Sequence, residues 1–214
     1  MLTSLALIAA LICPQPQNAA FTGLWESTAT TKGGIGNTIE FRPDGSIVEA
    51  LTVIVNMRYR LKGDRLLLES DSATKEQDSR NATIVAIKGQ KLLEKGPDGS
   101  VIEKDRVGSA VQGESGLVGA WRYRHYTGAI AFERYTPDGQ LLFRLPLSSS
   151  TGCFVARERE LTLAVPNQAE EVFRYDISGE KLVLTDSAGH SSSYRKDSNG
   201  PWYDREHLDY KHPK

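Results

Sequence analysis

Gly23-Leu24-Trp25 and Gly119-Ala120-Trp121 decide the fold, because the stretch that begins at the first tripeptide is repeated behind the second. Trp121 follows Trp25 by 96 positions, and three other landmarks recur in the same order at separations of 90 to 95 positions. They pair Pro43-Asp44-Gly45 with Pro137-Asp138-Gly139, Lys62–Leu66 with Arg157–Leu161, and Gly89–Leu92 with Gly179–Leu182. A drift of a few positions is typical of short loop deletions, so we predict an internal repeat with two copies.

The length and charge of the chain narrow the classes of protein. Its 214 residues allow one large domain or two small ones, and a hydrophobic content of 39% is enough for a core. The net charge of −1 gives no electrostatic attraction to nucleic acid or to an anionic membrane. We therefore expect a globular protein that does not bind nucleic acid; the sequence leaves its oligomeric state open.

The first twenty residues contain no charged side chain, and Leu5–Cys13 is a continuous apolar run. This run is too short to span a bilayer but has the length of a signal-peptide core. We predict a signal peptide over residues 1–20, cleavage after Ala20, and a periplasmic or secreted protein without a transmembrane span. A buried N-terminal strand or helix is the alternative. Lipid attachment at Cys13 is less favoured, because Ile12 stands where the processing enzyme needs a small residue.

The chain has two cysteines, Cys13 and Cys153. Removal of the signal peptide would take Cys13 away and leave Cys153 as the only thiol, so no intramolecular disulfide is expected. Cys153 is then predicted to be a small buried hydrophobic residue.

Short apolar or alternating runs, separated mostly by Gly, Pro, Asp or Ser, predict an all-β fold without helices. In the first copy the expected strands are 25–30, 37–41, 47–51, 53–61, 65–69, 82–87, 91–94 and 101–106. In the second copy they are 120–126, 130–135, 140–145, 153–157, 160–165, 172–177, 181–185 and 191–196. The predicted organisation is a first copy over residues 21–107, a linker over 108–116, a second copy over 117–197 and a polar tail over 198–214. Each copy is expected to fold on its own.

A Gly-x-Trp on the first strand, a Pro-Asp-Gly hairpin, an aromatic at Tyr59 or Phe154 and a late Gly-x-Lys-Leu strand follow in this order in both copies. The ordered set resembles the small lipocalin-like (calycin-type) domains of bacterial secreted proteins. The resemblance implies two small antiparallel meander β-barrels in tandem, over nearly the whole mature chain. It also implies a binding module, and it carries no catalytic residue to transfer.

Alternation along the strands indicates which side chains of the second copy could line a barrel interior. Such a barrel has room either for filling side chains or for one small ligand. The candidate ligand-binding residues are Trp121, Tyr123, Phe143, Phe154, Phe173 and Tyr175. Packing of these aromatics as a core without a ligand is the alternative, and the pattern favours it.

No catalytic residue, metal site or cofactor is predicted. His125 and His190 are the histidines of the second copy, and neither lies in a motif that pairs a histidine with a nucleophile. The tail carries several possible metal ligands without a helical His pair or a Cys pair, so a solvated tail is expected. These tail residues are Asp204, Glu206, His207, Asp209 and His212.

The second copy carries a set of arginines that alternate with apolar residues and could form a stripe on the outer wall of a barrel. They are Arg122, Arg124, Arg134, Arg144, Arg157, Arg159 and Arg174. Glu133, Glu158 and Glu160 are interleaved and could neutralise them through cross-strand ion pairs. An anionic ligand or partner is the alternative.

Three functions remain open from the sequence. The first is an extracytoplasmic, non-catalytic binding module, for a small apolar or anionic ligand. The second is a structural or interaction protein of the cell envelope, with side-chain-filled barrels that bind a macromolecular partner. The third is an enzyme, which is not favoured because no catalytic constellation is apparent.

Overall fold

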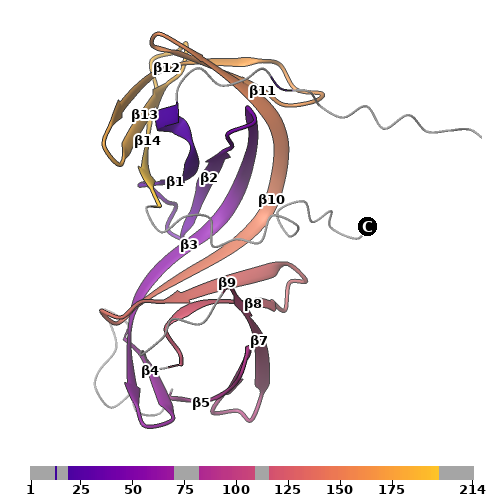
Figure 1. The fold of residues 1–214 in the computed structure, drawn as a ribbon, viewed down its shortest axis with the longest axis vertical. Helices are drawn as coiled ribbons and strands as arrows, with labels where there is room; N and C mark the ends of the chain where they lie inside the picture. Colours follow the sequence, from indigo (N-terminus) through magenta and orange to yellow (C-terminus); the bar gives the residue numbers. More distant parts are fainter. Residues whose placement is uncertain (1–12, 14–18, 70–81, 109–115, 198–214) are drawn as a thin grey trace, which may run out of the picture. The chain divides into compact units, whose positions relative to one another are not determined.

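A computed structural model describes Cys13 and residues 19–69, 82–108 and 116–197 (Figure 1). Within this part of the chain the protein is all-β, with one 3₁₀ turn, η1 (Ala19–Phe21), and fourteen strands. The strands are β1 (Gly23–Ser27), β2 (Ile35–Phe41), β3 (Ser46–Lys62), β4 (Arg65–Glu69), β5 (Thr83–Lys88), β6 (Lys91–Lys95), β7 (Val101–Val107), β8 (Gly119–Arg124), β9 (Ile130–Tyr135), β10 (Gln140–Arg157), β11 (Glu160–Ala164), β12 (Glu171–Ser178), β13 (Lys181–Thr185) and β14 (Ser191–Lys196). The predicted linker and tail fall mostly outside the described residues.

The strands form an antiparallel meander, in which each strand pairs with its neighbours along the chain. The meander closes into a ring where β1 pairs with β14, with Trp25 opposite Lys196. β3 and β10 also pair with each other across the sequence. The prediction of an antiparallel all-β meander is therefore confirmed, whereas the described strands close one ring of fourteen and not two separate rings.

Two long strands depart from the predicted pattern. The expected strands 47–51 and 53–61 are one strand, β3, and the expected strands 140–145 and 153–157 are one strand, β10. The two expected strands of the first copy were separated at Thr52, but the buried hydroxyl of Thr52 lies 3.1 Å from the hydroxyl of Thr38, within a continuous strand. In the second copy the residues between the two expected strands include Pro146 and Gly152, yet the chain runs through them in extended form as part of β10.

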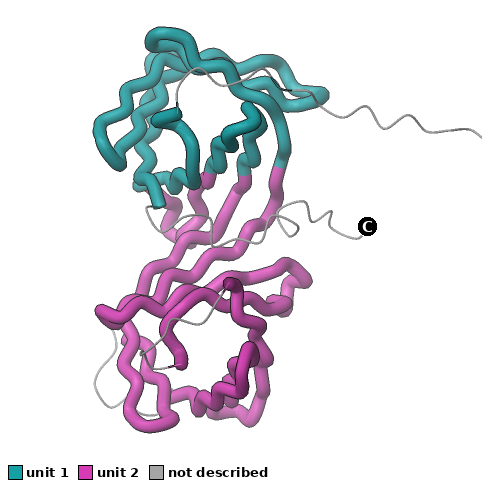
Figure 2. The backbone as a smooth tube through the Cα atoms, in the orientation of Figure 1, with its two compact units in different colours: residues 1–28, 39–49, 150–198 teal, residues 29–38, 50–149, 199–214 magenta. Residues whose placement is uncertain are grey.

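The structure divides into two compact units that do not follow the predicted boundary at residues 108–116. Among the described residues, unit 1 contains Cys13 and residues 19–28, 39–49 and 150–197, and unit 2 contains residues 29–38, 50–69, 82–108 and 116–149, as Figure 2 shows by colour. The change from one unit to the other occurs between β1 and β2 and within β2, β3 and β10. Both units therefore draw strands from both predicted copies.

The core of unit 1 is built around Phe21, which η1 carries and which is fully buried. Its ring lies 5.1 Å from that of Phe41 and 4.7 Å from that of Tyr175, and Phe41 meets Phe154 edge-on at 5.0 Å. Edge-on and tilted ring pairs of this kind add stabilisation beyond the area they bury. Side chains thus fill the middle of unit 1.

The described part of unit 2 includes two apolar clusters. The first surrounds Trp121 and Tyr135 and includes Leu66, Val85, Leu92, Leu117 and Leu141. The second contains the small residues Ala129 and Ala131 with Leu145, and Val53, Tyr123, Phe143 and Leu147 pack against it. The second cluster therefore combines small buried residues with partly buried aromatic ones.

Cys13 and Cys153 form a disulfide bond within unit 1, with the two Cα atoms 5.3 Å apart. The expectations that no intramolecular disulfide forms and that Cys153 is a plain buried hydrophobe applied to a chain without Cys13, whereas in the full chain Cys153 is bonded to Cys13. Phe21, placed just after the predicted cleavage site, lies in the core with no exposed surface. Cleavage after Ala20 would put a new charged amino group on this buried residue.

The disulfide predicts a simple thiol count. The full chain, folded under oxidising conditions, should show no thiol that reacts with an alkylating reagent, and two after reduction. Cys153→Ser should lower the free energy of unfolding by about 2–4 kcal/mol, because the crosslink restricts the unfolded chain. Intact-mass measurement before and after alkylation checks the count. Two reactive thiols in the oxidised, folded protein would contradict the bond.

Candidate functional site

Trp25 and Trp121 sit in equivalent settings, one in each unit. Both are fully buried. Trp25 Nε1 donates to the carbonyl of Phe21 at 2.6 Å, and Trp121 Nε1 donates to the carbonyl of Leu117 at 2.8 Å. Each indole therefore bonds to the residue four positions before it and fixes the chain that enters the first strand.

A cation covers each indole. The Arg106 guanidinium lies 4.0 Å from the Trp121 ring centre, and Lys196 Nζ lies 5.3 Å from that of Trp25. Such stacking is favourable because the ring face carries negative charge. Arg106 also donates to the carbonyls of Val118 and Gly116, and Lys196 donates to that of Ala20.

The glycines of the two Gly-x-Trp motifs make room for these cations. Gly23 has φ +124° and Gly119 has φ +127°, a region that side chains rarely adopt. A Cβ on Gly23 would lie 3.0 Å from Lys196 Cε, and one on Gly119 would lie 2.6 Å from Arg106 Nη1. Glycine is therefore required at both positions.

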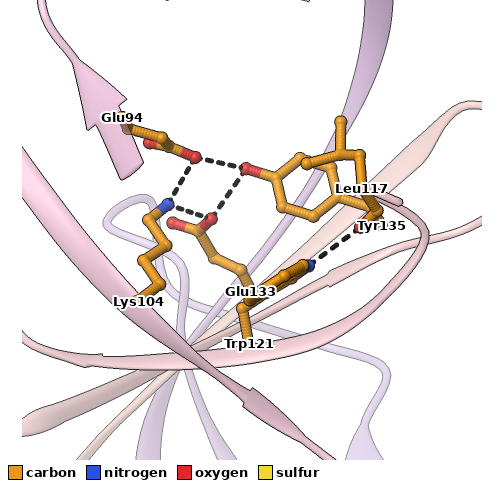
Figure 3. A network of polar contacts seen from close by, with 6 residues as sticks. All are labelled: Glu94, Lys104, Leu117, Trp121, Glu133 and Tyr135. Atoms are coloured by element: carbon orange, nitrogen blue, oxygen red, sulfur yellow. Dashed lines mark hydrogen bonds and ion pairs between the residues drawn. The ribbon is translucent and has the colours of Figure 1, made fainter. Parts of the chain in front are cut away.

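The most unusual polar feature is a buried cluster in unit 2, made of Glu94 (β6), Lys104 (β7), Glu133 and Tyr135 (β9) (Figure 3). The Lys104 side chain is 1% exposed, and its Nζ lies 2.7 Å from Glu94 Oε1 and also bonds to Glu133. The Tyr135 hydroxyl lies 2.9 Å from Glu94 Oε1 and 2.8 Å from Glu133 Oε2. We call these four residues the ionic cluster.

The Tyr135 hydroxyl lies between the two carboxylates of the ionic cluster. A tyrosine hydroxyl carries one hydrogen, so Tyr135 donates to only one carboxylate at a time. The hydroxyl therefore donates either to Glu94 Oε1 or to Glu133 Oε2. Burial, followed by the charge of Glu133, raises the pKa of Glu94, while Lys104 acts in the opposite direction. Burial together with Glu133 also raises the pKa of Tyr135 well above its usual value, so its hydroxyl stays protonated.

Tyr123 (β8) connects the ionic cluster to the second apolar cluster of unit 2. Lys104 Nζ lies 4.8 Å from the centre of the Tyr123 ring. Burial and the Glu133 carboxylate raise the pKa of the Tyr123 phenol, which keeps its hydrogen. The ring also packs against the cluster that contains Ala129 and Ala131. Charged, aromatic and small apolar groups therefore meet in one unit.

The structure separates the six predicted ligand-binding residues. Trp121, Tyr123 and Phe143 belong to unit 2, and Phe154, Phe173 and Tyr175 belong to unit 1. They were expected in one barrel because they are close in sequence, but the long β10 carries the chain from one unit into the other. In unit 1 Phe154 is fully buried, and the Tyr175 hydroxyl donates to the carbonyl of Glu158 at 2.6 Å.

The predicted arginine stripe is broken at Arg144, which is 1% exposed. Its guanidinium donates to the carbonyl of Val55 at 3.2 Å and to Asn56 Oδ1 at 2.9 Å. Arg144 is therefore a buried link between β10 and β3 and does not belong to an outer wall. Arg124, Arg157, Arg159 and Arg174 are exposed.

Glu94 and Lys104 were not among the residues predicted from the sequence, and Glu133 was predicted only as a neutralising charge. Alternation could have indicated Lys104, because it shares a face of β7 with Arg106, whose strand partner is Trp121. The neighbouring Val101 and Ile102 are exposed, which reverses the usual order of apolar and charged residues along a strand.

No family model matches the sequence, and no curated protein matches it.

Among the described residues no group of three or more His, Cys, Asp or Glu could hold a metal ion, and the tail histidines lie outside this part of the chain. No helix in the described ranges is long and apolar enough to cross a membrane.

Proposed function

We propose that the protein is a non-catalytic binding module of the extracytoplasmic space, built from two lipocalin-like barrels. The paired settings of Trp25 and Trp121 support this architecture. In each unit a buried indole donates to the carbonyl four residues before it and is covered by a basic side chain. The pairing between β3 and β10 supports it too, because it links two strands that lie far apart in the ring of fourteen. The disulfide is consistent with an oxidising compartment.

The ionic cluster carries the proposal for a ligand in unit 2. Two carboxylates, Glu94 and Glu133, share one ammonium group, Lys104, away from water. Buried charge of this kind is costly, and in some proteins it is retained because it provides specificity. An added cation can balance the second carboxylate. Among charged ligands this arrangement favours an amine over the anion suggested by the sequence.

The surroundings of the ionic cluster suit the apolar part of such a ligand. Tyr123 and Phe143 are partly buried and pack against Ala129 and Ala131, which are small. Binding sites for small molecules commonly combine apolar and aromatic side chains with a few oriented polar groups. We propose that a small aromatic or aliphatic amine lies against these side chains with its ammonium directed to Glu133.

A matched pair of probes tests the sign of the charge. Phenethylamine and 3-phenylpropionate have similar size and opposite charge at neutral pH. The amine is expected to bind and to raise the unfolding midpoint, and Glu133→Gln is expected to weaken its binding by at least about tenfold because a charged hydrogen bond is lost. Titration calorimetry below the unfolding range of each variant measures this. Glu103→Gln, which changes an exposed carboxylate of β7, is the control.

Equal binding of the carboxylate, or amine binding that Glu133→Gln leaves unchanged, would contradict the proposed ligand class. Failure of both probes would favour the second candidate, an envelope interaction protein with filled barrels. The packed rings of Phe21, Phe41 and Phe154 in unit 1 favour that candidate, because they occupy the middle of the unit.

A further inference from the structure

We infer that the two copies of the repeat have exchanged halves, so that each copy is the binding partner that completes the other's barrel. Unit 1 combines residues 21–28 and 39–49 of the first copy with residues 150–197 of the second. Unit 2 contains the rest of the first copy and the beginning of the second. This inference concerns how the chain assembles and does not rest on the proposed ligand.

The first observation is the closure of the strands beside the two tryptophans. Trp25 of the first copy lies opposite Lys196 of the second, and Trp121 of the second lies opposite Arg106 of the first. If each copy closed on itself, Trp25 would face Arg106 and Trp121 would face Lys196. In both units, however, this contact joins a tryptophan of one copy to a basic residue of the other copy.

The second observation is a pair of backbone hydrogen bonds at the Pro-Asp-Gly hairpins. In unit 1 the amide of Phe154 donates to the carbonyl of Gly45 at 2.9 Å. In unit 2 the amide of Tyr59 donates to the carbonyl of Gly139 at 2.8 Å. The carbonyl of each hairpin glycine therefore accepts a hydrogen bond from the long strand of the other copy. The two donors, Phe154 and Tyr59, lie at corresponding positions of the copies.

The third observation is a pair of ring contacts next to these bonds. Phe41 meets Phe154 at 5.0 Å and 81° in unit 1, and Tyr135 meets Tyr59 at 5.1 Å and 87° in unit 2. Tyr135 follows Phe41 by 94 positions, the same separation as Gly139 from Gly45. Phe41 and Tyr59 belong to the first copy, and Phe154 and Tyr135 belong to the second, so each ring pair joins the two copies.

The disulfide also joins two segments that are far apart in the sequence. Cys13 precedes the first copy and Cys153 lies in β10 of the second, yet both belong to unit 1. β3 and β10 act as the crossing segments, because each begins in one unit and ends in the other. A copy that closed its own barrel would need a turn in its middle. Each copy instead has an uninterrupted strand there, β3 in the first copy and β10 in the second. Exchange of identical elements through an extended hinge is a known route to assembly.

A cut between the copies tests the exchange. A protease site is inserted within residues 109–115 of the full chain carrying Cys153→Ser, so that no disulfide holds the pieces, and the folded protein is cleaved. The two fragments are expected to elute together at the volume of the uncut protein and to separate only in denaturant. After separation, neither fragment alone is expected to refold as a monomer, and mixing them should restore the original elution volume and melting transition.

A fragment that refolds alone into a monomer with a cooperative melt would overturn the inference, because it would show that a copy closes its own barrel. Separation of two folded fragments on the native column directly after cleavage would overturn it as well. Uncut Cys153→Ser protein is the control for folding in the absence of the disulfide.

Discussion

Trp121→Ala is expected to lower the free energy of unfolding by about 3–5 kcal/mol, as is Trp25→Ala. Each substitution removes a fully buried indole, leaves the carbonyl of Leu117 or Phe21 without its donor, and exposes the covering cation to an empty space. Small domains have a total stability of about 5–15 kcal/mol, so either loss is a large share. Thermal and denaturant melts measure it.

Tyr126→Ala is the matched control, because this aromatic side chain is 93% exposed and its loss should change stability by less than about 0.5 kcal/mol. Unchanged melting of both tryptophan variants would end the core assignment and would favour a ligand platform on an exposed rim. A loss in one variant alone would show that the two settings are not energetically equivalent.

Lys104→Met is expected to cost about 3–5 kcal/mol at neutral pH, since it leaves Glu94 and Glu133 buried without their cation. The cost should be smaller in acid. Burial already raises the pKa of Glu94, and removing Lys104 removes the charge that lowers it. A carboxyl with a raised folded-state pKa contributes stability at low pH and loses that contribution as the pH rises through the folded-state pKa.

Denaturant melts of Lys104→Met and the unsubstituted protein between pH 5 and pH 8 measure this difference. The triple variant with Lys104→Met, Glu94→Gln and Glu133→Gln is the control, because it removes the buried charges together and should recover most of the loss with little dependence on pH. A deficit in Lys104→Met that is the same at both ends of the range would contradict the buried-carboxylate explanation.

Local structure was predictable from the sequence wherever a turn residue marks it. Pro43-Asp44-Gly45 and Pro137-Asp138-Gly139 are followed by strands as expected, and the predicted strands 65–69, 130–135, 181–185 and 191–196 have the observed bounds. Gly45 and Gly139 adopt φ +82° and +81°, which explains why glycine marks these hairpins. Alternation and turn chemistry act over a few residues, so one sequence is sufficient to detect them.

The path of the chain was not predictable in the same way. Whether a strand ends near Thr52 or near Ser150 depends on partners supplied by the other copy, such as the amide of Phe154 for Gly45. The ionic cluster was missed for a related reason. Lys104 and Glu94 are ordinary charged residues until β6, β7 and β9 place them together with Glu133 away from water.

Contacts of the Trp25 indole test the exchange of halves most directly. In the full chain, with either lysine or arginine isotopically labelled, nuclear Overhauser effects can be recorded from the ring protons of Trp25 and Trp121 to the labelled side chains. The exchange of halves predicts cross-peaks from Trp25 to Lys196, whose Nζ lies 5.3 Å from the ring centre, and from Trp121 to Arg106. Cross-peaks from Trp25 to Arg106 and from Trp121 to Lys196 would show that each copy closes on itself and would contradict the account.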